Sequence, residues 1–220
     1  MNDRRTATAV GLFFIAATGL YVGGQAIYGP VLSAPDLIDL TSSQRRQVVL
    51  GVGVELVGVL SIPMIAVFLF PVLSRHSPAL ALAYVALRVI ESTLLLVVAG
   101  LTLTLVADPG AMAWSELRQT VDVFGFTPFL LSVGFVFPLS ALLLNAVLWS
   151  TRLVPRAISG FGLVGGVLLL AGGLVELLDL MSGLSPIALE AVSSGPIAVQ
   201  EMVFAVWLLA KGFSPGRRET

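Results

Sequence analysis

A small group of side chains in this sequence has residue types and positions that could do chemistry. Five are charged side chains inside strongly apolar stretches, and the sixth is a tyrosine that lies shortly before the arginine in sequence. The group is Glu55, Tyr84, Arg88, Glu91, Glu176 and Glu201. An ionised side chain costs roughly 2.5–3.5 kcal/mol at the centre of a bilayer by insertion scales, so such groups usually face one another and pair. We expect this group to form a ligand-binding site or a buried polar network.

Spacing organises part of this group. Tyr84, Arg88 and Glu91 lie at positions i, i+4 and i+7, so they share one face of a helix and Arg88 can pair with Glu91. A guanidinium can pair with two carboxylates, whereas this group contains four glutamates. At least one carboxyl should therefore lack a full counter-charge, and we expect it to hold a proton. A buried carboxyl of this kind suits a proton relay, and it would also anchor a cationic ligand.

Two interpretations of the buried charges stay open. The residues could line a polar cavity that is open to the outer side of a membrane and binds or moves a small ligand or a proton. Alternatively, this is a structural or accessory membrane protein whose buried charges only fix helix packing. An enzyme is the less favoured class, because no nucleophile–base motif, nucleotide-binding loop or zinc-protease motif is present.

Composition places the chain in a membrane. Apolar residues make up 57% of the 220 residues and charged residues only 11%, too few to cover the surface of a soluble domain. The net charge of -1 gives no basic field for a nucleic acid. The sequence contains no Cys and a single His, His76, so we expect no metal site, no cofactor and no catalytic residue. The expected partners are the lipid bilayer and a small-molecule or lipid ligand.

The elements that must position these residues are six apolar stretches of transmembrane length. They run roughly over 7–28, 48–71, 79–106, 124–150, 157–180 and 195–212. The sequence thus predicts an all-α, polytopic transmembrane helical bundle in one domain, residues 1–220. We interpret the first stretch as a retained helix and not as a signal peptide, since it is long and lacks a clear cleavage site. We also expect a short interfacial helix at Trp114–Arg118.

Positive charges in the loops predict the orientation of these helices. One side collects Arg4, Arg5, Arg75, Arg152, Arg156, Lys211, Arg217 and Arg218, and the other collects Arg45, Arg46 and Arg118. Eight cations against three place both termini in the cytoplasm. The predicted localisation is the inner (plasma) membrane of a cell, with several passes.

Glycine spacing predicts close contacts between helices. Gly19 and Gly23 form one small-xxx-small pair, and Gly162 and Gly166 form another. Because glycine has no side chain, such pairs let two helix backbones approach closely. We expect these faces to pack within the chain, and a homo-oligomer through Gly-rich faces is the alternative.

Other local signals concern helix ends and prolines. Thr41 and Gln44 match a capping box before the second stretch. Pro63, Pro128 and Pro138 each lack a backbone donor inside a stretch and should kink or locally open the helix.

Three segments carry a family resemblance. They are the run Leu80–Glu91 with its Tyr84-x-x-x-Arg88-x-x-Glu91 element, the turn Arg152-Leu153-Val154-Pro155-Arg156, and Pro71-Val72-Leu73. Together they resemble a bacterial membrane family known as domain of unknown function four-three-eight-six, over roughly residues 7–212. The resemblance implies an integral membrane protein with six helices. It marks Arg88 and Glu91 as part of the family pattern, and it implies no activity.

Overall fold

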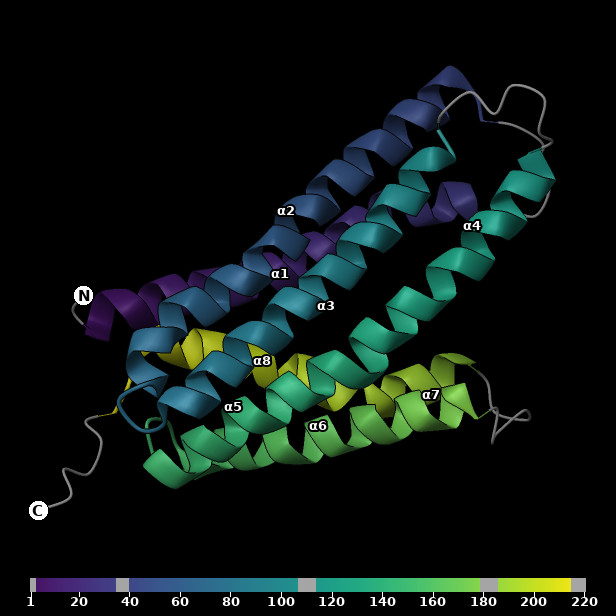
Figure 1. Ribbon diagram of the computed structural model, residues 1–220. Coiled ribbons are helices and arrows are strands. Elements are labelled where there is room, and N and C mark those ends of the chain that lie inside the picture. The colour runs from purple at the N-terminus through teal and green to yellow at the C-terminus, as the bar shows by residue number, and fades with distance from the viewer. Residues whose placement is uncertain (1–2, 35–39, 107–113, 179–185, 215–220) are drawn as a thin grey trace, which may run out of the picture.

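The computed structural model describes residues 3–34, 40–106, 114–178 and 186–214, and the regular elements in this part of the chain are all helices (Figure 1). They are α1 (Asp3–Leu32), α2 (Ser42–Leu73), α3 (Pro78–Thr104), α4 (Trp114–Phe129), the π-helix η1 (Leu130–Val136), α5 (Phe137–Thr151), α6 (Arg156–Leu177), α7 (Pro186–Ser193) and α8 (Gly195–Ala210). Among the described residues, six helical segments are long and apolar enough to cross a membrane. The predicted all-α class and the number of apolar helices are therefore confirmed.

One predicted boundary was wrong. The fourth candidate span is one helical segment of 36 residues, Glu116–Thr151, formed by α4, η1 and α5 in succession. The segment Trp114–Arg118 is thus the first part of α4 and not a separate interfacial helix, since no proline or glycine separates it from the span. The predicted start of the sixth stretch, residue 195, coincides with the start of α8, although the candidate span continues back into α7 as far as Ala191. A proline at the start of α8 lacks the backbone donor that would join α7 and α8 into one helix.

Two of the prolines that were expected to disturb a helix flank the π-helix. Leu130–Val136 lies between Pro128 and Pro138, and the amide of Phe137 donates to the carbonyl of Ser132, five residues back. The local opening expected there is confirmed. Pro63, in contrast, lies within an unbroken α2.

The capping box before α2 is also confirmed. The Thr41 side chain accepts from the backbone amide of Gln44, and the Gln44 side chain accepts from the amide of Thr41. This reciprocal pair satisfies two donors at the start of the longest single α-helix.

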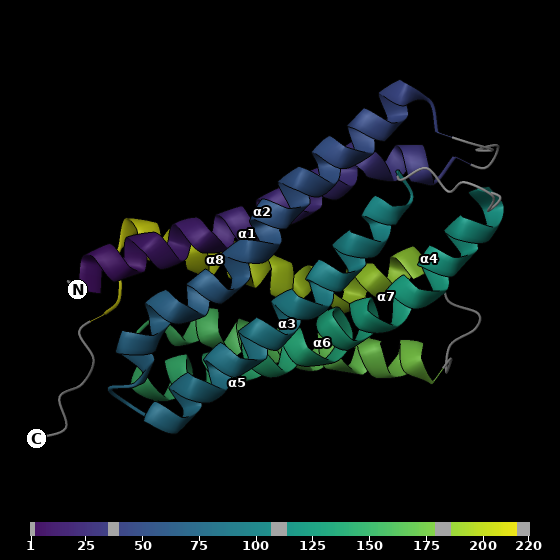
Figure 2. The same ribbon diagram turned by 45° about the horizontal axis from the view of Figure 1, so that its top comes forward.

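The helices run lengthwise along one another, and the start of α1 lies at the same end of the bundle as the end of α8 (Figures 1 and 2). Arg4 donates to the carbonyl of Leu209 at 2.6 Å, close to the end of α8. Arg75, in the turn between α2 and α3, pairs with Asp3 at 3.0 Å. We call this the basic end of the bundle; its cations are Arg4, Arg5, Arg75, Arg152, Arg156 and Lys211.

Glycine brings α1 and α2 into direct backbone contact. A Cβ atom on Gly24 would lie 2.5 Å from the carbonyl oxygen of Gly51, and one on Gly51 would lie 2.8 Å from the carbonyl oxygen of Gly24. The pair singled out from the sequence behaves differently, because a Cβ on Gly19 or Gly23 meets nothing within 4 Å. Packing within the chain was therefore the wrong expectation for that pair. The homo-oligomer stays a prediction, and Gly19 and Gly23 lie on a face that is open to it.

The second predicted pair packs within the chain. A Cβ on Gly162 would collide with the side chain of Asn145, and one on Gly166 would lie 2.9 Å from Leu142. Both contacts join α6 to α5, so the expectation of internal packing is confirmed for this pair.

Neighbouring glycines on α1 provide a test of this packing. Gly24→Leu should lower the free energy of unfolding by about 1–3 kcal/mol or more, because the new side chain has to displace the backbone of α2. Gly23→Leu is the matched control, since its side chain enters open space. Thermal unfolding in detergent would measure both. Equal melting temperatures for the two variants would contradict the close contact of α1 and α2.

Candidate functional site

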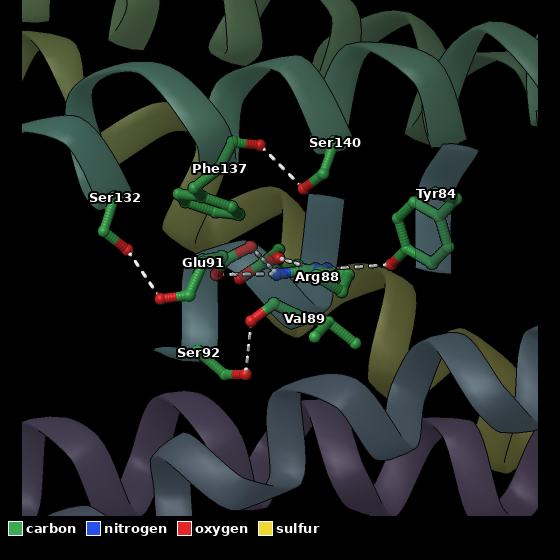
Figure 3. Close-up of polar contacts among 9 residues, drawn as sticks. Tyr84, Arg88, Val89, Glu91, Ser92, Ser132, Phe137 and Ser140 are labelled. Atoms are coloured by element: carbon green, nitrogen blue, oxygen red, sulfur yellow. Dashed lines mark hydrogen bonds and ion pairs between the residues drawn. The ribbon is translucent and has the colours of Figure 1, made fainter. Parts of the chain in front are cut away.

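Arg88 is the centre of a buried group of polar side chains (Figure 3). Its Nη1 donates to both carboxylate oxygens of Glu91, at 3.0 and 3.1 Å, and its Nε donates to the Tyr84 hydroxyl at 3.1 Å. Its Nη2 donates to Oε1 of Glu201 on α8 at 3.2 Å. We call Tyr84, Arg88, Glu91 and Glu201 the Arg88 cluster. The helical spacing on α3 pairs Arg88 with Glu91 as the sequence indicated, and α8 supplies the second carboxylate.

Three aromatic rings enclose the guanidinium. Its Cζ lies 5.6 Å from the ring centroid of Phe14 on α1, 5.5 Å from Tyr84 and 5.3 Å from Phe137 at the start of α5. An arginine over the face of an aromatic ring is attracted by the ring quadrupole, more strongly where water is absent. Arg88 is 3% exposed. The rings therefore stabilise the cation and keep water from it.

Hydroxyl groups surround the two carboxylates. Ser132, on the π-helix, donates to the backbone carbonyl of Glu91 at 3.0 Å. The Ser140 and Thr18 side chains lie near Glu91 and Glu201, respectively, and the Ser140 hydroxyl donates to the carbonyl of Phe137 at 2.8 Å. Sequence reasoning did not include Thr18 or Ser132, because their position depends on how α1 and the π-helix are rotated against α3.

Position along the helices places the cluster at mid-depth. Arg88 lies about ten residues from the start of α3 at the basic end, and Glu201 lies about ten residues from Lys211 at the same end. At 1.5 Å per residue, both are about 15 Å from the basic end. This is about half the ~30 Å thickness of a hydrocarbon core.

The charges of the cluster do not balance. It contains one cation, Arg88, and two carboxylates, Glu91 and Glu201, whose side chains are 6% and 13% exposed. In the part of the chain that the structure describes, no second cation forms an ion pair with either carboxylate. One proton on the cluster would make it neutral. Within the same part of the chain, no group of three His, Cys, Asp or Glu residues is arranged to hold a metal ion.

Two of the predicted site residues lie apart from the cluster. Glu55 is 2% exposed between α1 and α2, where it accepts hydrogen bonds from Tyr28 at 2.9 Å and from Gln25 at 3.5 Å. Glu176 is exposed near the end of α6, beyond the glycines that pack this helix against the bundle. The structure thus brings together Tyr84, Arg88, Glu91 and Glu201 from the predicted set.

A neutral polar pair lies next to the cluster. Gln200, adjacent to Glu201 on α8, donates from Nε2 to Oδ1 of Asn145 on α5 at 3.1 Å. The Asn145 amide in turn donates to the carbonyl of Ala141 at 2.9 Å. This chain of amides fixes the rotation of α8, and with it the direction of Glu201.

Because Glu91 and Glu201 share the guanidinium of Arg88, their substitutions should affect stability in a coupled way. Glu91→Gln and Glu201→Gln should each change the free energy of unfolding by no more than about 1 kcal/mol, because either variant leaves Arg88 with one full carboxylate and an amide oxygen acceptor. The double variant should lose about 3–5 kcal/mol, because it leaves a buried cation without a counter-charge. Chemical unfolding in detergent would measure all three. Additive effects would contradict the shared pairing.

Comparisons with known proteins agree with the family resemblance. The family model with the description "Domain of unknown function (DUF4386)" matches residues 8–212, which include the whole Arg88 cluster. No curated protein and no solved structure matches the chain. The match covers nearly the whole sequence, so this helical protein with six candidate membrane spans belongs to the DUF4386 family.

Proposed function

We propose that this protein binds and exchanges one proton at the Arg88 cluster, and that it uses this proton to bind or move a small ligand across the membrane. The observation that carries the proposal is the imbalance of charge. Arg88 lies at mid-depth between Glu91 and Glu201, and the described part of the chain gives the cluster no second cation.

The energetics of burial support one proton on the cluster. An ionised group without a partner in apolar surroundings is strongly destabilising, so a surplus carboxylate either stays wet or takes up a proton. The enclosing rings and the low exposure of Arg88 and Glu91 keep bulk water away from this group. A proton on Oε2 of Glu201 gives a neutral cluster and keeps every hydrogen bond to Arg88, because only Oε1 of Glu201 accepts from the guanidinium.

Exposure supports access to the cluster at Glu201. Glu201 is the most exposed member of the cluster, and it lies about 9 Å from the start of α8, at the end opposite the basic end. A polar path from that end to Glu201 would admit a proton or a small cationic ligand. In this proposal such a path ends at the Arg88 cluster, and Glu55 and Glu176 do not contribute to it.

A structural role is the second candidate function, and a specific observation favours it. The guanidinium of Arg88 contacts residues from α1, α3, α5 and α8, either through hydrogen bonds or through aromatic rings. A cluster that joins so many elements can fix helix packing with no exchange of protons. The two candidates differ in how stability depends on pH.

That pH dependence is the test. If the folded cluster holds one proton, the unfolded protein, whose glutamates are ionised in water above about pH 5, binds one proton fewer. The free energy of unfolding should then fall as pH rises, by up to about 1.4 kcal/mol per pH unit, until the folded cluster has lost its proton. Glu201→Gln should lower the slope by the contribution of this one proton, because the remaining pair of Arg88 and Glu91 is neutral without a proton.

Unfolding in detergent between about pH 5 and pH 8 would measure these slopes. Glu176→Gln, a carboxyl that lies outside the cluster, is the matched control and should keep the slope of the unaltered protein. An equal slope for the unaltered protein and Glu201→Gln would favour the structural role.

We also propose that the basic end faces the cytoplasm of a cell whose inner (plasma) membrane holds the protein. The support is the excess of cations at that end, which is the sign expected for cytoplasmic loops. The start of α1 and the end of α8 lie at the basic end, so both termini would be cytoplasmic.

The absence of cysteine from the sequence makes this orientation testable. His76→Cys lies in the turn between α2 and α3 at the basic end, and Ser42→Cys lies at the opposite end of α2; both positions are exposed. A thiol reagent that does not cross membranes should label Ser42→Cys in intact cells and His76→Cys only after the cells are opened. The reverse pattern would place the basic end outside.

A further inference from the structure

Glu55 is a buried carboxyl that the Arg88 cluster does not use. It lies on α2 against α1 and is 2% exposed. Its distance from Leu73, at the basic end of α2, is about 27 Å by helical rise, whereas the cluster is about 15 Å from that end. The two sites are thus separated by about 12 Å along the bundle.

The groups that face Glu55 are neutral. From α1, the Tyr28 hydroxyl donates to Oε2 at 2.9 Å, and Gln25 lies 3.5 Å from Oε1. From α3, which also packs on α2, the charged residues Arg88 and Glu91 are engaged with each other and with α8. Across the described ranges of the chain, no Lys, Arg or His pairs with Glu55.

These neutral partners fit a carboxyl in either protonation state. The oxygen and nitrogen of a glutamine amide can exchange places by a half-turn of the amide. An ionised Glu55 accepts from the amide nitrogen of Gln25, whereas a protonated Glu55 donates its O–H to the amide oxygen. Tyr28 donates to the other carboxyl oxygen in both cases.

We propose that Glu55, Tyr28 and Gln25 form a second proton-binding site, distinct from the Arg88 cluster. The bound proton neutralises a carboxyl that has no cation, and it lies on the hydrogen bond between Glu55 and Gln25. This inference goes beyond the function proposed for the Arg88 cluster and stands independently of it.

A polar face of α1 joins the two sites. Thr18, Tyr21, Gln25 and Tyr28 follow one another at intervals of three or four residues, so they lie on one face of the helix. Thr18 lies near Glu201, and Gln25 and Tyr28 are hydrogen-bonded to Glu55. Hydroxyl and amide groups thus extend along α1 from one carboxyl site to the other.

Infrared spectroscopy of the purified full-length protein at neutral pH would test the second site, because a protonated carboxyl has a carbonyl stretch that a carboxylate lacks. Glu55→Gln should remove one such signal. Glu201→Gln should remove another, and Glu176→Gln, the control for an exposed carboxyl on a helix, should remove none. Tyr28→Phe should shift the signal of Glu55 to higher frequency, because it deletes a hydrogen bond to the carboxyl, and should leave the signal of Glu201 in place.

The outcomes separate the two proposals. Loss of a signal in Glu55→Gln with none lost in Glu201→Gln supports the second site and overturns the proton proposed for the Arg88 cluster. An unchanged spectrum in Glu55→Gln overturns the second site, whatever Glu201→Gln shows. If Glu55→Gln does not fold, Tyr28→Phe decides: a shifted carboxyl signal supports the second site, and an unshifted spectrum overturns it.

Discussion

The neutralisation of one buried cation is the constraint on which the centre of this bundle depends. Arg88 lies about 15 Å from the basic end and is 3% exposed, so neither water nor lipid headgroups can compensate its charge. Glu91 can be supplied by the same helix, but Glu201 and the rings of Phe14 and Phe137 come from other helices. Side-chain reach then limits how far apart α1, α3, α5 and α8 can be. The glycines on the faces of α1, α2 and α6 supply the close backbone approach that this limit requires.

The π-helix allows two residues five positions apart to face α3 together, next to Arg88. Ser132 and Phe137 both face α3, one bonded to the carbonyl of Glu91 and the other over the guanidinium of Arg88. Positions five residues apart in a regular α-helix point about 140° away from each other. The wider turn of η1, with its bond from the amide of Phe137 to Ser132, brings them onto one face. Pro138 has no backbone donor, and this favours the irregular backbone, so the proline influences the site through the path of the helix.

Sequence reasoning succeeded where a feature depends on spacing within one helix. The pairing of Arg88 with Glu91 and the capping box at Thr41 are set by the rise and turn of a single helix. It failed where a feature depends on the rotation of one helix against another. Glu55, Glu176 and Glu201 all lie in apolar stretches, and only the packing of α8 shows that Glu201 is the one that meets Arg88. For the same reason Gly24, and not its neighbour Gly23, makes the contact with α2.

The structural and proton-binding roles proposed for the Arg88 cluster are linked by its charge. With one proton bound, Arg88 attracts a single carboxylate and the neutral carboxyl only accepts a hydrogen bond from it. Without the proton, Glu91 and Glu201 are both attracted to Arg88, but they also repel each other across the same guanidinium. One of these carboxyls is on α3 and the other is on α8. A change of protonation therefore changes the electrostatic force between α3 and α8. If the cluster fixes the packing of these helices, a proton that binds to it can also alter that packing.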